Sequence, residues 1–164
     1  MNIRIGSKED ILLIKDLAYK TWWPTYEKIL SPEQISFMLE KMYSEEALKE
    51  QFDNNYCFYI ARRTGRDVGF ASISCTEPEH KIYKLHKIYV LPMEQGKGTG
   101  RELITHVEEE VRKAGGRILE LNVNRNNPAL GFYRSIGFEI FKEEDIPFFE
   151  YYMNDYVMRK TLQT

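Results

Sequence analysis

Cysteine, long apolar runs and a signal-like N-terminus are scarce or absent in this sequence. Cys57 and Cys75 are its only cysteines, and neither belongs to a CxxC motif or a Cys/His cluster. This predicts no metal site and no disulfide framework, and we expect both thiols to be reduced core residues. The N-terminus "MNIRIGSKED" lacks an apolar signal core, and no stretch of about eighteen apolar residues occurs. We therefore expect a cytoplasmic protein without membrane association.

An excess of positive charge is also absent. The chain has 23 Lys and Arg against 25 Asp and Glu, giving a formal net charge of −2. General nucleic-acid binding needs a basic surplus, so we expect no nucleic-acid partner. Hydrophobic residues make up 43% and charged residues 29%, which is typical of a soluble globular chain. With no internal repeat or linker, the 164 residues predict a single domain over 1–164.

The hydrophobic periodicity predicts helices in the first third of the chain and mostly strands after it. Ser7 and Asp10 have capping-box spacing, and Ser31 is followed by Pro32 at a helix start. Expected helices are 7–22, 31–44, 44–52, 101–113 and 126–138; expected strands are 2–5, 56–63, 68–75, 81–90, 117–123, 139–144 and 150–162. This order predicts an α/β (α+β) fold with a single mixed, mainly antiparallel sheet flanked by helices.

The segment "QGKGTG", residues 95–100, joins an expected strand to an expected helix. Glycine costs about 1 kcal/mol in a helix interior, so its repetition here asks for a reason. Helix N-termini present unpaired N–H groups that bind anions, and a missing Cβ lets a phosphate approach them. The segment does not match the Walker A pattern or the dinucleotide fingerprint. An ordinary turn before a frayed helix is the alternative.

A second motif is "NVNRNNPALGFYRSIGFE", residues 122–139. Together, Q-x-x-G-x-G and V-x-x-x-N-x-A-x-x-F-Y-x-x-x-G-F resemble the Gcn5-related N-acetyltransferase (GNAT) family over about residues 56–160. The resemblance implies the acyl-CoA N-acyltransferase fold, acetyl-CoA as cosubstrate and no metal. It implies direct transfer of an acetyl group to a primary amine in a ternary complex.

The resemblance also implies which residues hold acetyl-CoA. The pantetheine arm would pair with the backbone of the strand end, and the pyrophosphate would lie on the loop amides. An asparagine at the second motif would contact the pantetheine arm; spacing leaves both Asn126 and Asn127 open, and N-capping is the ordinary role of the latter. The cofactor-binding candidates are Ile88, Tyr89, Val90, Gln95, Gly96, Lys97, Gly98, Thr99, Gly100, Arg101, Asn126 and Asn127.

Tyr133 matches the family's catalytic tyrosine, which donates a proton to the leaving thiolate. Phe132 beside it is expected in the core. His86 matches the position where many members place a glutamate base, and an imidazole can accept a proton near neutral pH. The alternative reading of His86 is a surface or packed residue, and Glu77, Glu79 and Glu120 are other candidate bases. His80 and His106 are expected at the surface.

The acceptor amine is less constrained by the sequence. Trp22, Trp23 and Tyr26 form either a cage for an ammonium group through cation–π contacts or a plain helix–sheet contact. The first helices and the C-terminal "MNDYVMRKTL" resemble a polyamine-acetylating branch, so a small-molecule amine such as spermidine or spermine is the leading substrate. Available carboxylates are Glu27, Glu33, Glu40, Asp145, Glu150 and Asp155.

Two other functions stay open from the sequence. One is acetylation of a protein N-terminus or lysine, and the other is a coenzyme A-binding sensor without turnover. The aromatic segment "FFEYYM", residues 148–153, is a candidate homodimer surface.

Overall fold

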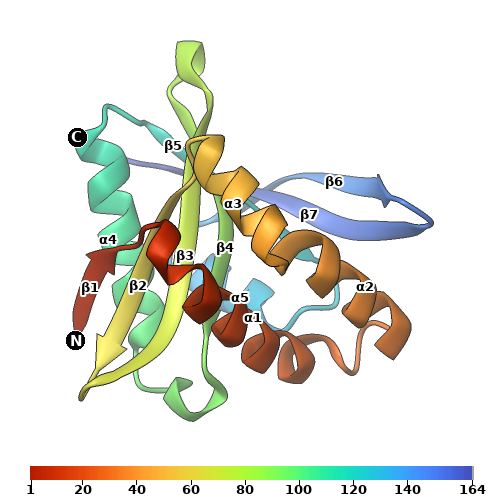
Figure 1. Ribbon diagram of the computed structural model, residues 1–164. Helices are drawn as coiled ribbons and strands as arrows, with labels where there is room; N and C mark the ends of the chain where they lie inside the picture. The colour runs from red at the N-terminus through yellow and green to blue at the C-terminus, as the bar shows by residue number, and fades with distance from the viewer. Residues whose placement is uncertain (164) are drawn as a thin grey trace. The chain divides into compact units, whose positions relative to one another are not determined.

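The computed structural model describes residues 1–163, and Figure 1 shows its helices and strands. The α-helices are α1 (Ile11–Tyr26), α2 (Pro32–Tyr43), α3 (Glu45–Asp53), α4 (Thr99–Lys113) and α5 (Ala129–Ser135). The strands are β1 (Asn2–Ile5), β2 (Cys57–Arg63), β3 (Arg66–Glu77), β4 (Ile82–Val90), β5 (Ile118–Asn124), β6 (Glu139–Phe148) and β7 (Tyr151–Thr161). Short 3-10 turns are η1 (Lys8–Asp10), η2 (Pro78–His80) and η3 (Pro92–Glu94).

The strands are ordered β1-β2-β3-β4-β5-β7-β6 along a seven-stranded sheet. β4 and β5 run parallel, whereas the pairs β1–β2, β2–β3, β5–β7 and β6–β7 are antiparallel. The predicted mixed, mainly antiparallel sheet with helices is therefore confirmed.

The chain divides into two compact units, which we describe separately. The first consists of Met1–Ser74 and Lys87–Val107, and the second of Cys75–His86 and the residues from Glu108 onward. The expectation of one domain over residues 1–164 stays a prediction.

In the first unit, helices pack on both faces of β2. Phe58 stacks on Phe52 of α3 with ring centroids 4.7 Å apart, whereas Tyr59 contacts the His106 ring of α4 at 5.2 Å. Successive strand residues point to opposite faces, so α3 and the middle of α4 around His106 lie on opposite sides of this strand. The expectation of a surface position for His106 was wrong: it is half-buried, because the aromatic ring of the strand covers it.

The helix starts follow the serines in the sequence. Ser7 and Asp10 form a capping box, and the side chains of Ser31 and Ser44 each accept a backbone N–H of the helix that follows. These predicted starts are confirmed. The first helix, however, continues beyond the predicted end, through Pro24 to Tyr26. Proline removes one helical hydrogen bond, and Trp22 and Tyr26 on either side of it pack with ring centroids 4.5 Å apart.

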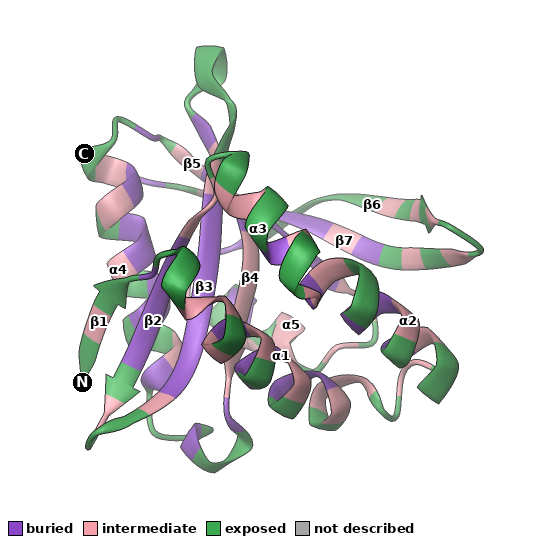
Figure 2. Cartoon of the chain, in the orientation of Figure 1, coloured by how far each residue is buried: buried purple, intermediate pink, exposed green. Residues whose placement is uncertain are grey.

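In the second unit, β5 carries the buried residues Leu119, Leu121 and Val123 in alternation. It pairs with β4 over Ile82–Leu85 and with β7 as far as Asn124. Strand β6 lies at the end of the strand order, and most of its residues are exposed (Figure 2).

The two cysteines correct one expectation. Both are free thiols, but Cys57 is half-buried and Cys75 is exposed, so neither is a core residue. β3 continues past its buried stretch to Glu77, and its last residues project into solvent. The apolar residues around Cys75 in the sequence therefore suggested a burial that the structure does not have.

We predict that Gly116→Ala destabilises the second unit. A Cβ at Gly116 would lie 2.8 Å from Tyr83 Cδ1 and also collide with the Val111 side chain. Overpacking of this kind costs about 1–3 kcal/mol, so thermal unfolding should show a lower Tm.

Gly131→Ala is the matched control, because a Cβ there meets no atom within 4 Å and Gly131 lies inside α5. This change should be neutral or stabilise by about 0.5–1 kcal/mol. Equal Tm values for the two variants would contradict the packing argument.

Candidate active site

The glycine loop has an open, left-handed backbone. Gly96 and Gly98 have φ angles of +82° and +81°, and a Cβ added to either would meet no atom within 4 Å. Helix α4 begins at Thr99, and the Glu102 N–H donates to the Gly98 carbonyl at 3.0 Å. The N–H groups of the first helical turn therefore have no intrahelical acceptor. This geometry suits an anion at the helix N-terminus.

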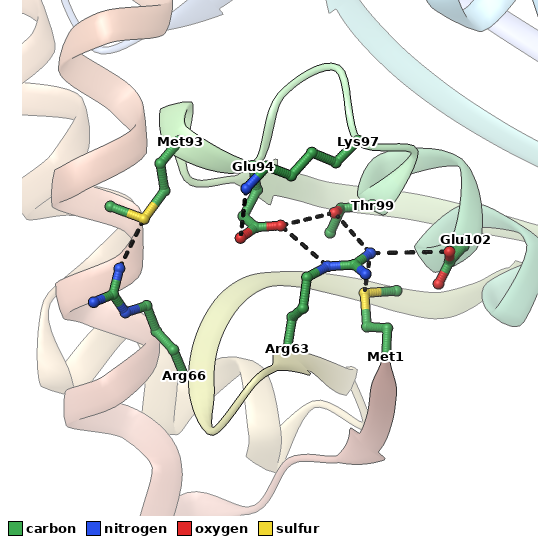
Figure 3. A network of polar contacts seen from close by, with 8 residues as sticks. All are labelled: Met1, Arg63, Arg66, Met93, Glu94, Lys97, Thr99 and Glu102. Carbon is green, nitrogen blue, oxygen red and sulfur yellow. Dashed lines mark hydrogen bonds and ion pairs between the residues drawn. The ribbon is translucent and has the colours of Figure 1, made fainter.

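A buried polar network lies beside this loop (Figure 3). Glu94 is only 6% exposed, and its Oε2 lies 3.2 Å from Arg63 Nε. Thr99 Oγ1 donates to the same oxygen at 3.2 Å. No motif in the sequence indicates Glu94 or Arg63, since no local pattern connects a strand end to a distant loop.

Lys97 belongs to the same network. Its Nζ lies 3.8 Å from Glu94 Oε1, and its backbone N–H donates to the Glu94 carbonyl at 3.3 Å. The side chain is 57% exposed, so it can still move towards an anion in solvent.

The end of β4 is held close to β3 within the first unit. A Cβ at Gly69 would lie 2.7 Å from the Tyr89 carbonyl oxygen, and the Leu91 N–H donates to Val68 O at 2.8 Å. Only glycine permits this backbone approach. Ile88, Tyr89 and Val90 are half-buried there.

An aromatic cluster gathers around the end of β4. Trp22 lies 4.5 Å from the Tyr26 ring and 6.1 Å from the Tyr89 ring, between centroids. The hydroxyls of Tyr26 and Tyr89 are 3.0 Å apart. Trp22 and Tyr26 share a helix face because they are four residues apart, whereas Trp23 lies about 100° around the helix.

Two more rings extend this cluster. Tyr43 contacts Trp22 at 5.8 Å and Phe70 at 6.3 Å between centroids, and burial raises the pKa of the Tyr43 phenol. The ammonium of Lys87 lies 5.0 Å from the Tyr43 ring centroid. The cluster thus already packs against one cation.

In the second unit, the asparagines follow the end of β5. Asn127 Oδ1 accepts the Ala129 N–H at 2.9 Å, so its side chain caps the start of α5. The capping role expected from sequence is confirmed. The cap uses only the Oδ1 atom of Asn127, and its Nδ2 takes no part in it. Asn126 is exposed, and its backbone N–H donates to Asn124 Oδ1 at 2.9 Å.

Tyr133 is the buried member of the aromatic pair in α5. It is 9% exposed and contacts the Phe138 ring at 6.0 Å, whereas Phe132 is half-buried. The expectation of Phe132 as the core residue is therefore corrected. The left-handed Gly137, at φ +103°, ends the helix and leads to Phe138, which is buried.

Comparison with known proteins agrees with both motifs. The profile of the acetyltransferase (GNAT) domain matches residues 26–161. The chain belongs to the GNAT family. It is an acetyl-CoA-dependent N-acetyltransferase, with acetyl-CoA as its cosubstrate.

Individual relatives are similar at modest identity. Spermidine N(1)-acetyltransferase of Thermoplasma acidophilum is 27% identical over 146 residues, covering 85% of this chain and 89% of that protein. An uncharacterised N-acetyltransferase of Methanocaldococcus jannaschii is 34% identical over 87 residues, which are 50% of this chain but 38% of that one. The crystal structure of the PaiA N-acetyltransferase of Thermoplasma acidophilum with coenzyme A matches with a TM-score of 0.81 and 27% identity, covering 98% and 99% of the two chains.

The candidate bases of this GNAT domain differ in their surroundings. Glu120 Oε2 accepts a hydrogen bond from Arg159 Nε at 2.7 Å. Glu77 and Glu79 are exposed, and His86 is half-buried in β4. The assignment of His86 stays a prediction.

Within residues 1–163, no group of three or more His, Cys, Asp or Glu side chains has an arrangement that could hold a metal ion. None of the helices in this range is long and apolar enough to cross a membrane.

Asp155 is a buried carboxylate in the second unit of the GNAT domain. It is 8% exposed, and Asn122 Nδ2 donates to its Oδ2 at 3.3 Å. Burial raises the pKa of the Asp155 carboxyl, although the Asn122 hydrogen bond and the charges of Lys84 and Arg125 act in the opposite direction. Ionising this group therefore costs more in the folded chain than in the unfolded chain.

We predict that Asp155→Asn stabilises the protein at neutral pH. Because the folded pKa is raised, the unfavourable contribution is absent below the unfolded pKa of about 4 and develops as pH rises through the folded value. The variant should therefore have a higher Tm at pH 7, with the difference shrinking towards pH 4.

Asp10→Asn is the control, and it should change Tm at pH 7 in the opposite direction, that is, lower it. The hydrogen bond from Arg4 lowers the pKa of Asp10, so its charge stabilises the fold above the unfolded pKa and that stability is lost as pH falls. A lower Tm of Asp155→Asn at pH 7 would show that its neighbours depend on the buried charge.

Proposed function

We propose that this N-acetyltransferase acetylates a primary amine of a polyamine. The observation that carries the proposal is the cluster of Trp22, Tyr26 and Tyr89, where two hydroxyls meet beside an indole. Aromatic faces attract ammonium groups and tolerate the methylene chain between them. The similarity to a spermidine N(1)-acetyltransferase over 85% of this chain supports the same substrate class.

The glycine loop fits the diphosphate of acetyl-CoA. Space is open in front of Gly96 and Gly98, so phosphate oxygens can approach the backbone of the loop from Gly96 to Arg101 at these two positions. The Lys97 N–H already donates to the Glu94 carbonyl and would have to exchange this partner. When bound, acetyl-CoA supplies the thioester and the acetyl group. Lys97 and Gln95 add a mobile cation and an amide at the same loop.

In the proposed reaction, the amine nitrogen forms a bond to the acetyl carbon while the carbon–sulfur bond breaks. Tyr133 donates its phenolic proton to the departing sulfur, because a thiol leaves more readily than a thiolate. His86 accepts one proton from the substrate ammonium, directly or through water, so that the neutral amine attacks. The second proton that the nitrogen loses as the amide forms restores the phenol of Tyr133. Asn127 Nδ2 and the backbone of Ile88, Tyr89 and Val90 orient the pantetheine arm.

The proposed role of Trp23 is narrower. It is half-buried and lies off the helix face that carries Trp22 and Tyr26. It lines the outer side of the acceptor region in this proposal, with the exposed Glu27 as a carboxylate for a distal ammonium.

A homodimer and a cytoplasmic location both stay predictions. The candidate surface is the β6–β7 hairpin, where Phe149 is 67% and Tyr152 is 60% exposed. Large apolar groups exposed together are typical of association surfaces.

We predict that Tyr133→Phe lowers kcat by about 10²–10³-fold, within the range of lost general acid catalysis. The KM for acetyl-CoA should change little, because the phenyl ring keeps its packing against Phe138. The measurement is steady-state kinetics with a thiol-release assay over pH 6–9. Unchanged turnover would remove Tyr133 as the acid.

We also predict that spermidine, spermine and 1,4-diaminobutane are acetylated with a higher kcat/KM than 1-aminobutane. The last compound has the same four-carbon chain with one ammonium, so it isolates recognition of the second charge. Products would be identified by mass spectrometry.

The same assay separates the other two functions. Faster acetylation of peptides through their N-termini or lysines would replace the polyamine by a protein substrate. Calorimetric binding of coenzyme A without transfer to any amine would indicate a sensor.

A further inference from the structure

Glu94 places a negative charge directly before the loop that is proposed to bind a diphosphate. Its side chain is buried, with 6% of its surface exposed. A carboxylate next to an anion site repels the ligand unless it is neutralised. A stabilising role of Glu94 would have to outweigh this repulsion.

Three side chains from three elements form a closed triangle there (Figure 3). Arg63, at the end of β2, pairs with Glu94 Oε2 through Nε at 3.2 Å. Thr99, at the start of α4, donates from Oγ1 to the same oxygen at 3.2 Å and accepts from Arg63 Nη2 at 3.3 Å. Each corner thus contacts the other two.

The triangle connects the two ends of the glycine loop. Glu94 precedes the loop and Thr99 follows it, while Gly96 and Gly98 between them adopt left-handed conformations. Glycines have more conformational freedom to lose than other residues. Fixing both ends reduces the number of conformations that the free loop can adopt. Less conformational entropy is then lost when a ligand binds, which raises the affinity.

Because the triangle is largely buried, water cannot easily replace its hydrogen bonds. Thr99 is 1% exposed, so its hydroxyl can satisfy its hydrogen bonds only inside the protein. Arg63 also lies 3.9 Å from Glu102 Oε1 through Nη2, which extends its contacts to the first turn of α4.

We propose that Arg63, Glu94 and Thr99 are positioning residues that hold the loop in its anion-binding form before acetyl-CoA arrives. They set the affinity for the cosubstrate and leave the chemical step unchanged. This inference depends on the proposed role of the loop in binding the diphosphate.

Removing the charge of Glu94 distinguishes two explanations, because they predict opposite changes in coenzyme A affinity. If Glu94 acted only through its charge, Glu94→Gln would remove repulsion and tighten coenzyme A binding. If it holds the loop, the same change weakens the contacts to Arg63 and Thr99 and loosens binding.

We expect Glu94→Gln to weaken coenzyme A binding about tenfold by calorimetry, the effect of losing roughly one charge-assisted hydrogen bond. The KM for acetyl-CoA should rise in parallel, with kcat at saturating acetyl-CoA within about twofold. Asp10→Asn is the control, since it breaks the more exposed Arg4–Asp10 pair of the same unit and should lower Tm without changing either constant.

Thr99→Val provides a second variant, should Glu94→Gln fail to fold. Valine keeps the shape and removes the hydroxyl, so coenzyme A affinity should fall about fivefold. Thr99→Ser retains the hydroxyl and should lose less affinity than Thr99→Val.

The outcomes separate this inference from the function on which it rests. If the unmodified protein takes up no coenzyme A, the diphosphate role of the loop is wrong and the positioning role with it. If it binds coenzyme A but Glu94→Gln binds equally or more tightly, or Thr99→Val and Thr99→Ser lose the same affinity, only the positioning role is overturned.

Discussion

The proposed diphosphate role of the loop between β4 and α4 requires backbone N–H groups that a ligand can reach while the chain reverses into a helix. Side chains would block that approach, and the left-handed φ angles of Gly96 and Gly98 would strain most other residues. The buried Glu94 carboxylate contacts both sides of this loop, because its partners are Arg63 of β2, Thr99 of α4 and Lys97 of the loop itself.

The first unit combines this loop with the aromatic cluster. Both lie at the end of β4, where Gly69 lets β3 approach the Tyr89 carbonyl. The half-buried Tyr89 therefore takes part in both features. Its backbone belongs to the strand end that precedes the loop, and its ring contacts Trp22 and Tyr26. The proposed sites for the acceptor amine and for the cosubstrate therefore both begin at the end of one strand.

Several features were readable from local sequence because each depends on neighbouring residues. The serine caps, the glycine loop, the N-cap at Asn127 and the alternation along β5 follow from backbone geometry over a few positions. The family motifs likewise combine residues close in sequence. Burial was harder to read: Cys75 stands in an apolar stretch but is exposed, and His106 lies on a polar helix face but is covered by Tyr59.

The sequence by itself determined the order of helices and strands, the glycine loop and membership of the GNAT family, since these are written in periodicity and short motifs. Only the tertiary structure decided that Arg63 meets Glu94 and Thr99, that Tyr26 stays helical beyond Pro24, and that Asp155 is buried. Such contacts join residues distant along the chain. Their energies depend on desolvation and packing, which no local pattern encodes.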